Sequence, residues 1–218
     1  VVLSNSIEVP PTGRPTVCIV HGLNFGVVDG TPAAGSPTPT RATWGSRGRR
    51  GFYAVRSRGL NQIVTVSEAS RDALAAAGVS RERVSVIHNG VDLDVFRPGT
   101  GRADDGRVRF VYPSRILPGK GQHLAIDALA RLPRLHKRRA ELHIVGAVVD
   151  PVYLDQLRVQ AYNQPVVFYT DVPDIAPHIQ DADVVLFPSV MAEGFGFTAV
   201  EAMACGRPVI WSDQPAIR

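Results

Sequence analysis

The sequence is poor in cysteine and has no long apolar segment. Only two cysteines, Cys18 and Cys205, occur in 218 residues, and both stand among apolar or small residues. Isolated thiols in such settings are typical of reduced core residues rather than of a disulfide, which favours a cytoplasmic location. No apolar run reaches the ~18 residues that span a bilayer, and no signal peptide is visible. We therefore expect neither a disulfide-stapled secreted fold nor a helical membrane protein.

Acidic residues are fewer than basic ones. The chain has 20 Asp and Glu against 24 Lys and Arg, and its formal net charge is +4. The basic residues gather in two groups: Arg47, Arg49, Arg50, Arg56 and Arg58, and Arg131, Arg134, Lys137, Arg138 and Arg139. Solvated helix faces and loops explain both groups most simply, and docking to an anionic membrane surface is the alternative. Nucleic acid is not an expected partner, because no recognised motif or interleaved aromatic residues accompany the charge.

Strand and helix signals alternate along most of the chain. The expected strands cover residues 16–20, 62–66, 84–87, 108–112, 141–145, 166–169, 183–187 and 208–211. The expected helices cover residues 47–59, 67–77, 122–132, 152–162 and 175–180, and a last one follows Gly196 and ends at Gly206. Residues 24–46 should form a long loop and residues 89–107 a polar linker. This alternation predicts an α/β fold with parallel sheets and right-handed crossovers.

Residues 193–208 form the most informative stretch. Two carboxylates, Glu193 and Glu201, bracket a glycine-rich turn that leads into a helix of small residues. Gly194 and Gly196 allow a ligand to approach the main chain, and free N–H groups at a helix start favour an anion. Glu201 should lie about two turns into the helix, where its carboxylate suits sugar hydroxyls. The combination suits a sugar nucleotide, and simple packing of a glycine-rich turn is the alternative.

The turn around Arg115 has phosphate-binding chemistry. Release of a diphosphate builds negative charge, which fixed cations and dipoles neutralise where no metal does so. Arg115 can hold a phosphate with two hydrogen bonds, and Lys120 supplies a point charge. Gly119 and Gly121 let the backbone approach a ligand. Taken alone, the segment is equally typical of a surface turn with two exposed cations.

Four segments together resemble one enzyme family. Residues 193–201 resemble the E-X7-E signature of retaining family-4 glycosyltransferases, also called glycosyl transferases group 1. Three further segments follow in the family's order: Val66-Ser-Glu-Ala-Ser-Arg71, Ile87-His-Asn-Gly-Val-Asp-Leu-Asp-Val-Phe96 and Tyr112-Pro-Ser-Arg-Ile-Leu-Pro-Gly-Lys-Gly121. The resemblance runs from about His21 to the end of the chain, and the ordered set is far more specific than any single motif.

The resemblance implies the GT-B fold, in which two Rossmann-like domains face each other. Residues 1–95 would belong to the N-terminal, acceptor-side domain, and residues 96–218 to the C-terminal domain that binds the nucleotide sugar. Because 218 residues are few for such a pair, we expect the N-terminal domain to be incomplete and the C-terminal domain to be truncated. A chain without both complete domains should be inactive on its own, since catalysis depends on their closure.

The resemblance also implies roles for individual residues. His21, Arg115, Lys120 and Glu193 match catalytic positions, with Arg115 and Lys120 on the diphosphate and Glu193 on the transferred sugar. The remaining donor contacts fall on Gly194, Phe195, Gly196, Phe197, Thr198 and Glu201. The implied reaction moves a hexose-type sugar from a nucleotide-diphosphate sugar to an acceptor with retention of anomeric configuration. Its implied mechanism is front-face attack, in which the leaving phosphate helps to deprotonate the acceptor.

No metal or cofactor is implied. Asp92-Leu-Asp94 and Asp181-Ala-Asp183 have the Asp-X-Asp spacing that binds Mg²⁺ or Mn²⁺ in other glycosyltransferases. The first pair lies in the linker motif, however, and the second precedes a strand. No cluster of histidines and cysteines suggests zinc.

Other functions remain as alternatives. A glycosidase also uses two carboxylates, but it would leave Arg115 and Lys120 without a purpose. A non-catalytic sugar-nucleotide-binding domain and a GT-B epimerase or phosphorylase stay open.

The donor base and the acceptor are not specified by the sequence. It departs from the family pattern at Tyr112-Pro-Ser, Ala147 and Tyr169-Thr-Asp171, which leaves the base open. The acceptor should be a carbohydrate or lipid-linked, and a lipid-linked acceptor would favour peripheral contact with the inner membrane face.

Overall fold

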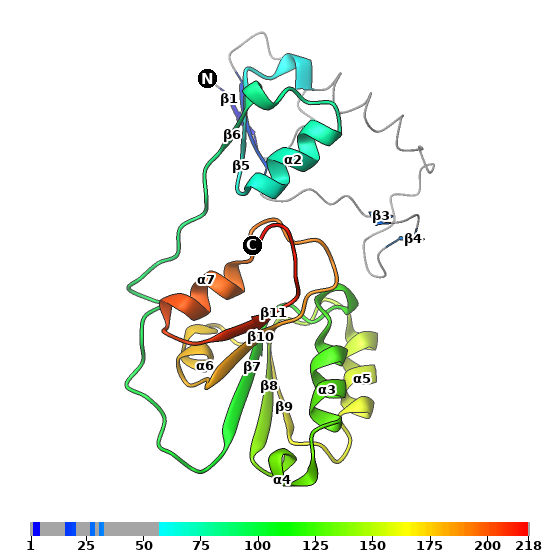
Figure 1. Cartoon of the computed structure of the whole chain (residues 1–218), viewed down its shortest axis with the longest axis vertical. Helices are drawn as coiled ribbons and strands as arrows, with labels where there is room; N and C mark the ends of the chain where they lie inside the picture. Colours follow the sequence, from blue (N-terminus) through cyan, green and yellow to red (C-terminus); the bar gives the residue numbers. More distant parts are fainter. Residues whose placement is uncertain (1, 5–15, 21–26, 29–30, 33–56, 218) are drawn as a thin grey trace.

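The computed structural model describes residues 2–4, 16–20, 27–28, 31–32 and 57–217. Within these ranges the chain forms two parallel sheets, which Figure 1 shows one above the other. The first sheet has the order β1-β2-β5-β6, with β1 (Val2–Ser4), β2 (Thr16–Val20), β5 (Gln62–Thr65) and β6 (Val84–Val86). Two short strands of two residues each, β3 (Val27–Val28) and β4 (Thr31–Pro32), form a separate antiparallel pair.

One helix, α2 (Glu68–Ala76), joins β5 to β6. Ser67 caps it by accepting a hydrogen bond from the Ser70 N–H, as a serine before a helix commonly does. Leu74 is fully buried and packs in a cluster with Cys18 and Ile63 of the sheet. The cluster holds α2 against the first sheet.

The second sheet has five parallel strands in the order β11-β10-β7-β8-β9. They are β7 (Val108–Pro113), β8 (Ala140–Gly146), β9 (Val166–Thr170), β10 (Val184–Phe187) and β11 (Val209–Trp211). The chain adds β8 and β9 on one side of β7, and then returns to add β10 and β11 on the other side. The strand order thus reverses between β7 and β10, which is the place where open α/β sheets bind ligands.

Helices cover both faces of the second sheet. Figure 1 shows α3 (Gln122–Ala130) and α5 (Pro151–Gln160) on one face, and α6 (Ala176–Gln180) and α7 (Phe197–Ala204) on the other. A short helix, α4 (Arg134–Lys137), lies at the lower end. Each face buries its own apolar cluster, one around Ile126 and Ile144 and one around Val185 and Ile179.

A linker joins the two sheets. Residues 87–107 contain no helix or strand and run in Figure 1 along the outside of the lower sheet, down to the start of β7. Phe96 packs against the cluster beneath α6 and α7, and the Phe96 N–H donates to the Asp92 carbonyl at 2.8 Å. The linker is therefore anchored to the second sheet from about Asp92 onward.

The predicted α/β class with parallel sheets is confirmed, as are the strands predicted within the described residues. The helix expected over 122–132 ends at Ala130, because Pro133 follows closely and starts the unpredicted α4. The 24–46 loop and most of the helix expected over 47–59 lie outside the described residues, and Ser57–Gly59 forms a single 3₁₀ turn. Cys18 and Cys205 are buried free thiols, as predicted.

None of the described helices has both the length and the apolar character needed to cross a bilayer.

Candidate functional site

The candidate site lies where β7 and β10 end. Since these strands pair directly, the turn after β7 and the turn after β10 are neighbours, although about 70 residues separate them in the chain. The Gly119 carbonyl accepts hydrogen bonds from the Val190 N–H at 3.1 Å and the Met191 N–H at 2.9 Å. These bonds hold the two predicted ligand turns together.

Gly121 is required by this close approach. Its φ is +81°, and a Cβ atom there would lie 2.5 Å from the Pro188 carbonyl oxygen. A side chain would both strain the backbone and push the two turns apart. The glycine assigned to ligand approach thus serves the packing of one turn on the other.

Lys120 and Glu193 meet in the space between the turns. Lys120 Nζ lies 2.7 Å from Glu193 Oε1, and the two side chains are only 12% and 11% exposed. Lys120 also lies over the Phe187 ring, 5.4 Å from its centroid. The structure therefore brings together two residues that were predicted from different motifs.

Arg115 is exposed at the rim of the same turn. It forms no ion pair with any residue that the structure describes. Its carbonyl accepts a hydrogen bond from Gln122 Nε2 at 2.9 Å, and Gln122 is fully buried. The backbone of Arg115 is thus fixed while its guanidinium group stays available to an anion.

The start of α7 has the predicted form. Gly196 precedes it with φ +90°, a left-handed conformation that suits glycine. The Thr198 hydroxyl donates to the Pro113 carbonyl at 3.1 Å and so fastens α7 to the end of β7. The hydroxyl proton is engaged there, and a phosphate contact by Thr198 stays a prediction for which its backbone N–H is the available donor.

Glu201 lies closer to the helix start than expected. The helix begins at Phe197, directly after Gly196 as predicted, so Glu201 is its fifth residue and lies little more than one turn in. Burial raises the pKa of its carboxyl group above the ordinary value. No hydrogen-bond donor reaches this carboxylate from the described residues, which leaves it free to accept from hydroxyl groups.

Phe195 of the glycine-rich turn lies between the first residue of α7 and the linker. The Phe195 ring centroid lies 5.2 Å from that of Phe197 and 6.3 Å from that of His88. His88 Nδ1 in turn lies 3.1 Å from the Val66 carbonyl oxygen at the end of the first sheet. His88 belongs to the linker motif, but no pattern in the sequence predicted this bridge. His21 lies outside the described residues.

Comparison with protein families identifies the chain's relatives. Residues 107–218 match the family described as glycosyl transferases group 1, and residues 6–95 match the one described as glycosyltransferase family 4. The chain belongs to the glycosyl transferases group 1 family. The family predicted from the four ordered motifs is confirmed.

Among the relatives are D-inositol 3-phosphate glycosyltransferases of Mycobacterium tuberculosis and Mycobacterium bovis, 36% identical over 163 residues. The match covers 68% of this chain and 33% of the relative, so the chain spans about a third of the length of these curated relatives.

Similar solved structures include Anabaena Alr3699/HepE in complex with UDP and glucose, with a TM-score of 0.72 and 25% identity. That match covers 94% of this chain and 54% of the Anabaena chain. Sucrose-phosphate synthase of Thermosynechococcus elongatus is alike in fold, with a TM-score of 0.67, 23% identity, and 91% and 50% of the two chains covered. The GT-B fold class is confirmed by these neighbours.

The two Asp-X-Asp pairs of this group 1 member serve the backbone. Asp92 accepts the Asp94 N–H at 2.9 Å. Asp183 accepts the Arg109 N–H at 2.7 Å and a guanidinium N–H of Arg102 at 2.9 Å. The described residues contain no group of three or more ligands suited to a metal ion, and metal independence stays a prediction.

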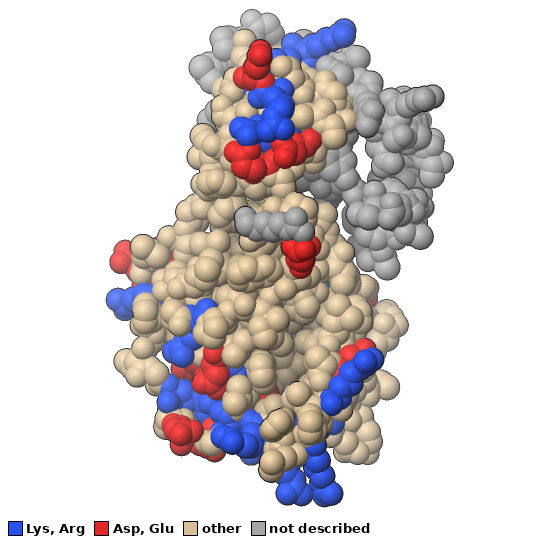
Figure 2. Space-filling model, viewed as in Figure 1, with Lys and Arg blue, Asp and Glu red and all other residues tan. Residues whose placement is uncertain are grey.

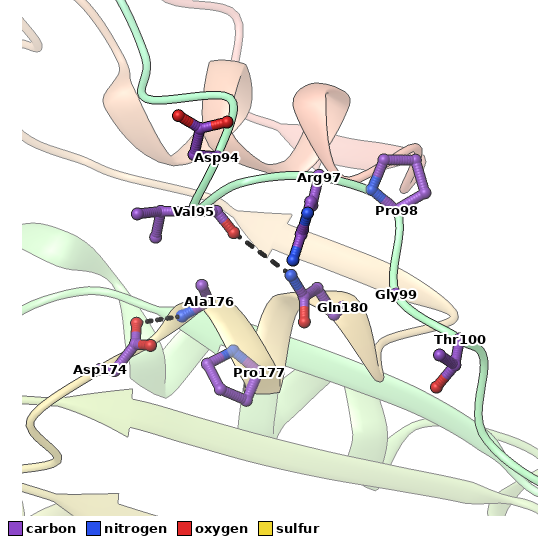
Figure 3. Close-up of a pocket in the computed structure, with 10 residues that line it drawn as sticks. All are labelled: Asp94, Val95, Arg97, Pro98, Gly99, Thr100, Asp174, Ala176, Pro177 and Gln180. Carbon is purple, nitrogen blue, oxygen red and sulfur yellow. Dashed lines mark hydrogen bonds between the residues drawn. The ribbon is translucent and has the colours of Figure 1, made fainter.

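Two hollows among the described residues lie away from the predicted family site. Figure 3 shows a pocket of about 550 Å³ between the linker and α6, lined among others by Arg97, Thr100 and Gln180. A second, of about 200 Å³, is lined by Arg109, His143, Tyr169, Pro177, His178 and Asp181.

The second basic group lies at the opposite end of the lower sheet from Lys120. Arg131, Arg134, Arg138 and Arg139 are exposed, and Lys137 is partly exposed. Figure 2 shows basic side chains gathered at the lower end of the molecule, where Figure 1 places α4. Among the described residues these five cations have no ion-pair partner, which agrees with a solvated surface.

Proposed function

We propose that this chain carries the nucleotide-sugar site of a retaining glycosyltransferase that transfers a hexose-type sugar to an acceptor hydroxyl. The observation that carries the proposal is the contact of Lys120 with Glu193, between the turns that follow β7 and β10. A cation suited to a diphosphate and a carboxylate suited to sugar hydroxyls lie side by side there. In a nucleotide-diphosphate sugar, the diphosphate and the sugar hydroxyls are likewise next to each other.

The diphosphate would be bound by fixed positive charge. Arg115 and Lys120 supply two cations, and the N-terminus of α7 adds free N–H groups and the positive end of the helix dipole. Backbone N–H groups of residues 194–197 and the Thr198 N–H complete this cradle. We infer that these groups take the part that a divalent metal has in other transferases, so that neither a metal nor a cofactor is required.

Two carboxylates would recognise hydroxyl groups. Glu193 is placed to accept from the transferred sugar, and Glu201 from the ribose. Glu201 is half-buried and has no donor among the described residues, which supports an acceptor role. His21, by its resemblance to the family pattern, would contact the donor near the reacting carbon.

The transfer would proceed on one face of the sugar. The bond between the anomeric carbon and the diphosphate oxygen breaks, and the acceptor oxygen bonds to the same face of that carbon. The leaving phosphate oxygen accepts the acceptor's proton. Arg115 and Lys120 lower the barrier by stabilising the charge on the diphosphate as it leaves.

The relatives suggest which substrates to test first. Alr3699/HepE binds UDP and UDP-glucose, which supports a uridine diphosphate hexose as the first donor. The relatives named for D-inositol 3-phosphate support a phosphorylated polyol as the first acceptor, beside carbohydrate and lipid-linked acceptors.

We further propose that the chain divides into two domains between residues 95 and 96, and that the part before this boundary belongs to the acceptor-side domain. We also propose a cytoplasmic location. The α4 surface is a poor membrane contact for a lipid-linked acceptor, since it would turn the carboxyl ends of the strands away from the bilayer. A peripheral contact would instead involve the basic residues between Arg47 and Arg58, which precede the linker in the acceptor-side half of the sequence.

The reaction is tested in a protein that joins this segment to a complete acceptor domain. UDP-glucose and an acceptor should give a product with the donor's anomeric configuration, measured from the coupling of the anomeric proton. Glu193→Ala should lower kcat at least ~100-fold and leave UDP binding intact. An inverted product would contradict retention, and donor binding without release of UDP for any acceptor would indicate a binding module. The 218-residue chain itself is expected to bind the donor without transfer.

A further inference from the structure

Ser189 is the second hydrogen-bond donor to Glu193. Its Oγ lies 2.5 Å from Glu193 Oε1, and the residue is 1% exposed. Lys120 Nζ contacts the same oxygen at 2.7 Å. In the described part of the chain, no donor lies within hydrogen-bond distance of Glu193 Oε2. The two donors thus fix the carboxylate by one oxygen and leave the other to a ligand.

The two donors differ in what else they can bind. The Lys120 ammonium has three N–H groups and is proposed to contact the diphosphate as well. The Ser189 hydroxyl has one proton, and its other neighbours, the carbonyl oxygens of Gly119 and Met191, lie farther away at 3.4 and 3.3 Å. Because Ser189 is buried, its hydroxyl stays with Glu193 whether or not a diphosphate is bound.

The position of Ser189 is itself fixed from a third segment. Its carbonyl oxygen accepts one hydrogen bond from Ser212 Oγ at 2.6 Å and one from Gln214 Nε2 at 3.1 Å. Both residues belong to the loop that follows β11. On the other side, the next two N–H groups bond to Gly119. The hydroxyl is therefore held in place by residues that need not touch the ligand.

We propose that Ser189 is a positioning residue, which presents the free oxygen of Glu193 to the hydroxyls of the transferred sugar. This inference rests on the proposed donor site. On this proposal, the Ser189 hydroxyl is the reason that the site binds a sugar nucleotide more tightly than the free nucleoside diphosphate. The diphosphate contacts of Arg115 and Lys120 do not depend on its hydroxyl.

The test is calorimetric titration of the chain and its Ser189→Ala variant with UDP and with UDP-glucose. The affinity for UDP-glucose should fall roughly tenfold in the variant, since a hydrogen bond to a charged group is lost. The affinity for UDP should change less than twofold. Ser212→Ala is the matched control, because it removes only one of the two bonds to the Ser189 carbonyl, while the Gln214 bond and the two N–H bonds to Gly119 still hold the Ser189 hydroxyl on Glu193. Its ratio of UDP-glucose to UDP affinity should stay at the wild-type value.

A double-mutant cycle separates positioning from general structure. In a Glu193→Ala background, Ser189→Ala should have no further effect on the affinity ratio. If Ser189→Ala does not fold, Ser189→Cys keeps the side-chain size with a weaker donor and should lower the ratio in the same direction.

Equal weakening of UDP and UDP-glucose binding in the variants would overturn the proposal. A wild-type chain that binds both ligands equally would overturn it too, and would leave the nucleotide site standing. A wild-type chain that binds neither would instead refute the proposed function on which the inference rests.

Discussion

Lys120 and Glu193 form an ion pair at 2.7 Å that joins the ends of two neighbouring strands. Both side chains are almost buried, so that neither charge is screened well by solvent. In the proposed function the same two groups bind the diphosphate and the sugar. Each charge of the pair thus neutralises the other, and the contact places the two binding groups side by side.

Removal of one partner should therefore cost stability. We expect Lys120→Met to destabilise the chain by roughly 1–3 kcal/mol, because Glu193 keeps a buried charge with Ser189 as its remaining donor. The double variant Lys120→Met/Glu193→Gln should be more stable than the sum of the two single effects predicts. Urea denaturation of all four proteins measures the coupling, and additive effects would show that the pair contributes nothing.

Gly121→Ala tests the close approach of the two turns. We expect a loss of roughly 3 kcal/mol or more, from the left-handed backbone and the 2.5 Å contact with Pro188. Gly101→Ala is the matched control, since Gly101 has φ +85° and open space around its Cβ position. Thermal denaturation should show a loss of about 1 kcal/mol for the control. Equal losses in the two variants would contradict the tight packing at Pro188.

The parts of the molecule differ in how well they could be predicted. Apolar runs and flanking glycines located β7, β10 and α7, because a buried strand and a small-residue helix have distinct periodicities. The four-residue α4 was missed, since it is too short to show a period. Glu201 was placed too deep in α7, although the start of the helix after Gly196 was predicted correctly, because the fifth residue of a helix with 3.6 residues per turn lies little more than one turn in.

The contacts of the site were harder to predict than its members. Lys120 and Glu193 were both chosen from the sequence, but their pairing depends on β10 lying beside β7. Ser189 lies outside the four motifs, and its bond to Glu193 depends on side-chain torsion angles. The bridge from His88 to Phe195 depends on how the linker leaves the first sheet, and no local pattern encodes that.

Glu201→Gln should separate stability from binding. Burial raises the pKa of this carboxyl group above its value in the unfolded chain, so the protonated form stabilises the fold at low pH, and this contribution is lost as pH rises through the raised pKa. At neutral pH the neutral amide should therefore raise the Tm of the empty chain. It should also weaken binding of the nucleotide roughly tenfold, since an amide accepts hydroxyl groups less strongly than a carboxylate. A lower Tm would show that the ionised carboxylate has a stabilising partner.

Acid should destabilise the chain through two histidines. Burial lowers the pKa of His143, and the Glu141 carboxylate offsets only part of this effect. Burial also lowers the pKa of His178, and Asp181 and Asp174 offset part of that effect. The charge of Arg109 lowers both pKa values further. The Tyr169 ring contacts both histidine rings in a tilted arrangement, with centroid distances of 5.1 Å to His143 and 4.7 Å to His178. The unfolded chain takes up protons first, so stability is complete above the ordinary histidine pKa and falls as pH drops through about 6.5.

The acid effect is measured as the fall in Tm between about pH 7.5 and 5.5. His143→Gln should make this fall smaller, because one of the two proton-linked groups is removed. The exposed His136, changed to Gln, is the control and should leave the pH profile unchanged. A pH profile of His143→Gln identical to that of the wild type would contradict the assignment.

The account's central claim is that a nucleotide-diphosphate sugar binds where β7 and β10 end. Calorimetric titration of the chain with UDP, GDP, ADP and their hexose conjugates tests it most directly, with Lys120→Ala and Glu201→Ala as the site variants. We predict saturable binding of one nucleotide and its sugar conjugate, weakened roughly tenfold or more by each variant. A folded chain that binds none of these ligands, or variants that bind as tightly as the wild type, would contradict the claim.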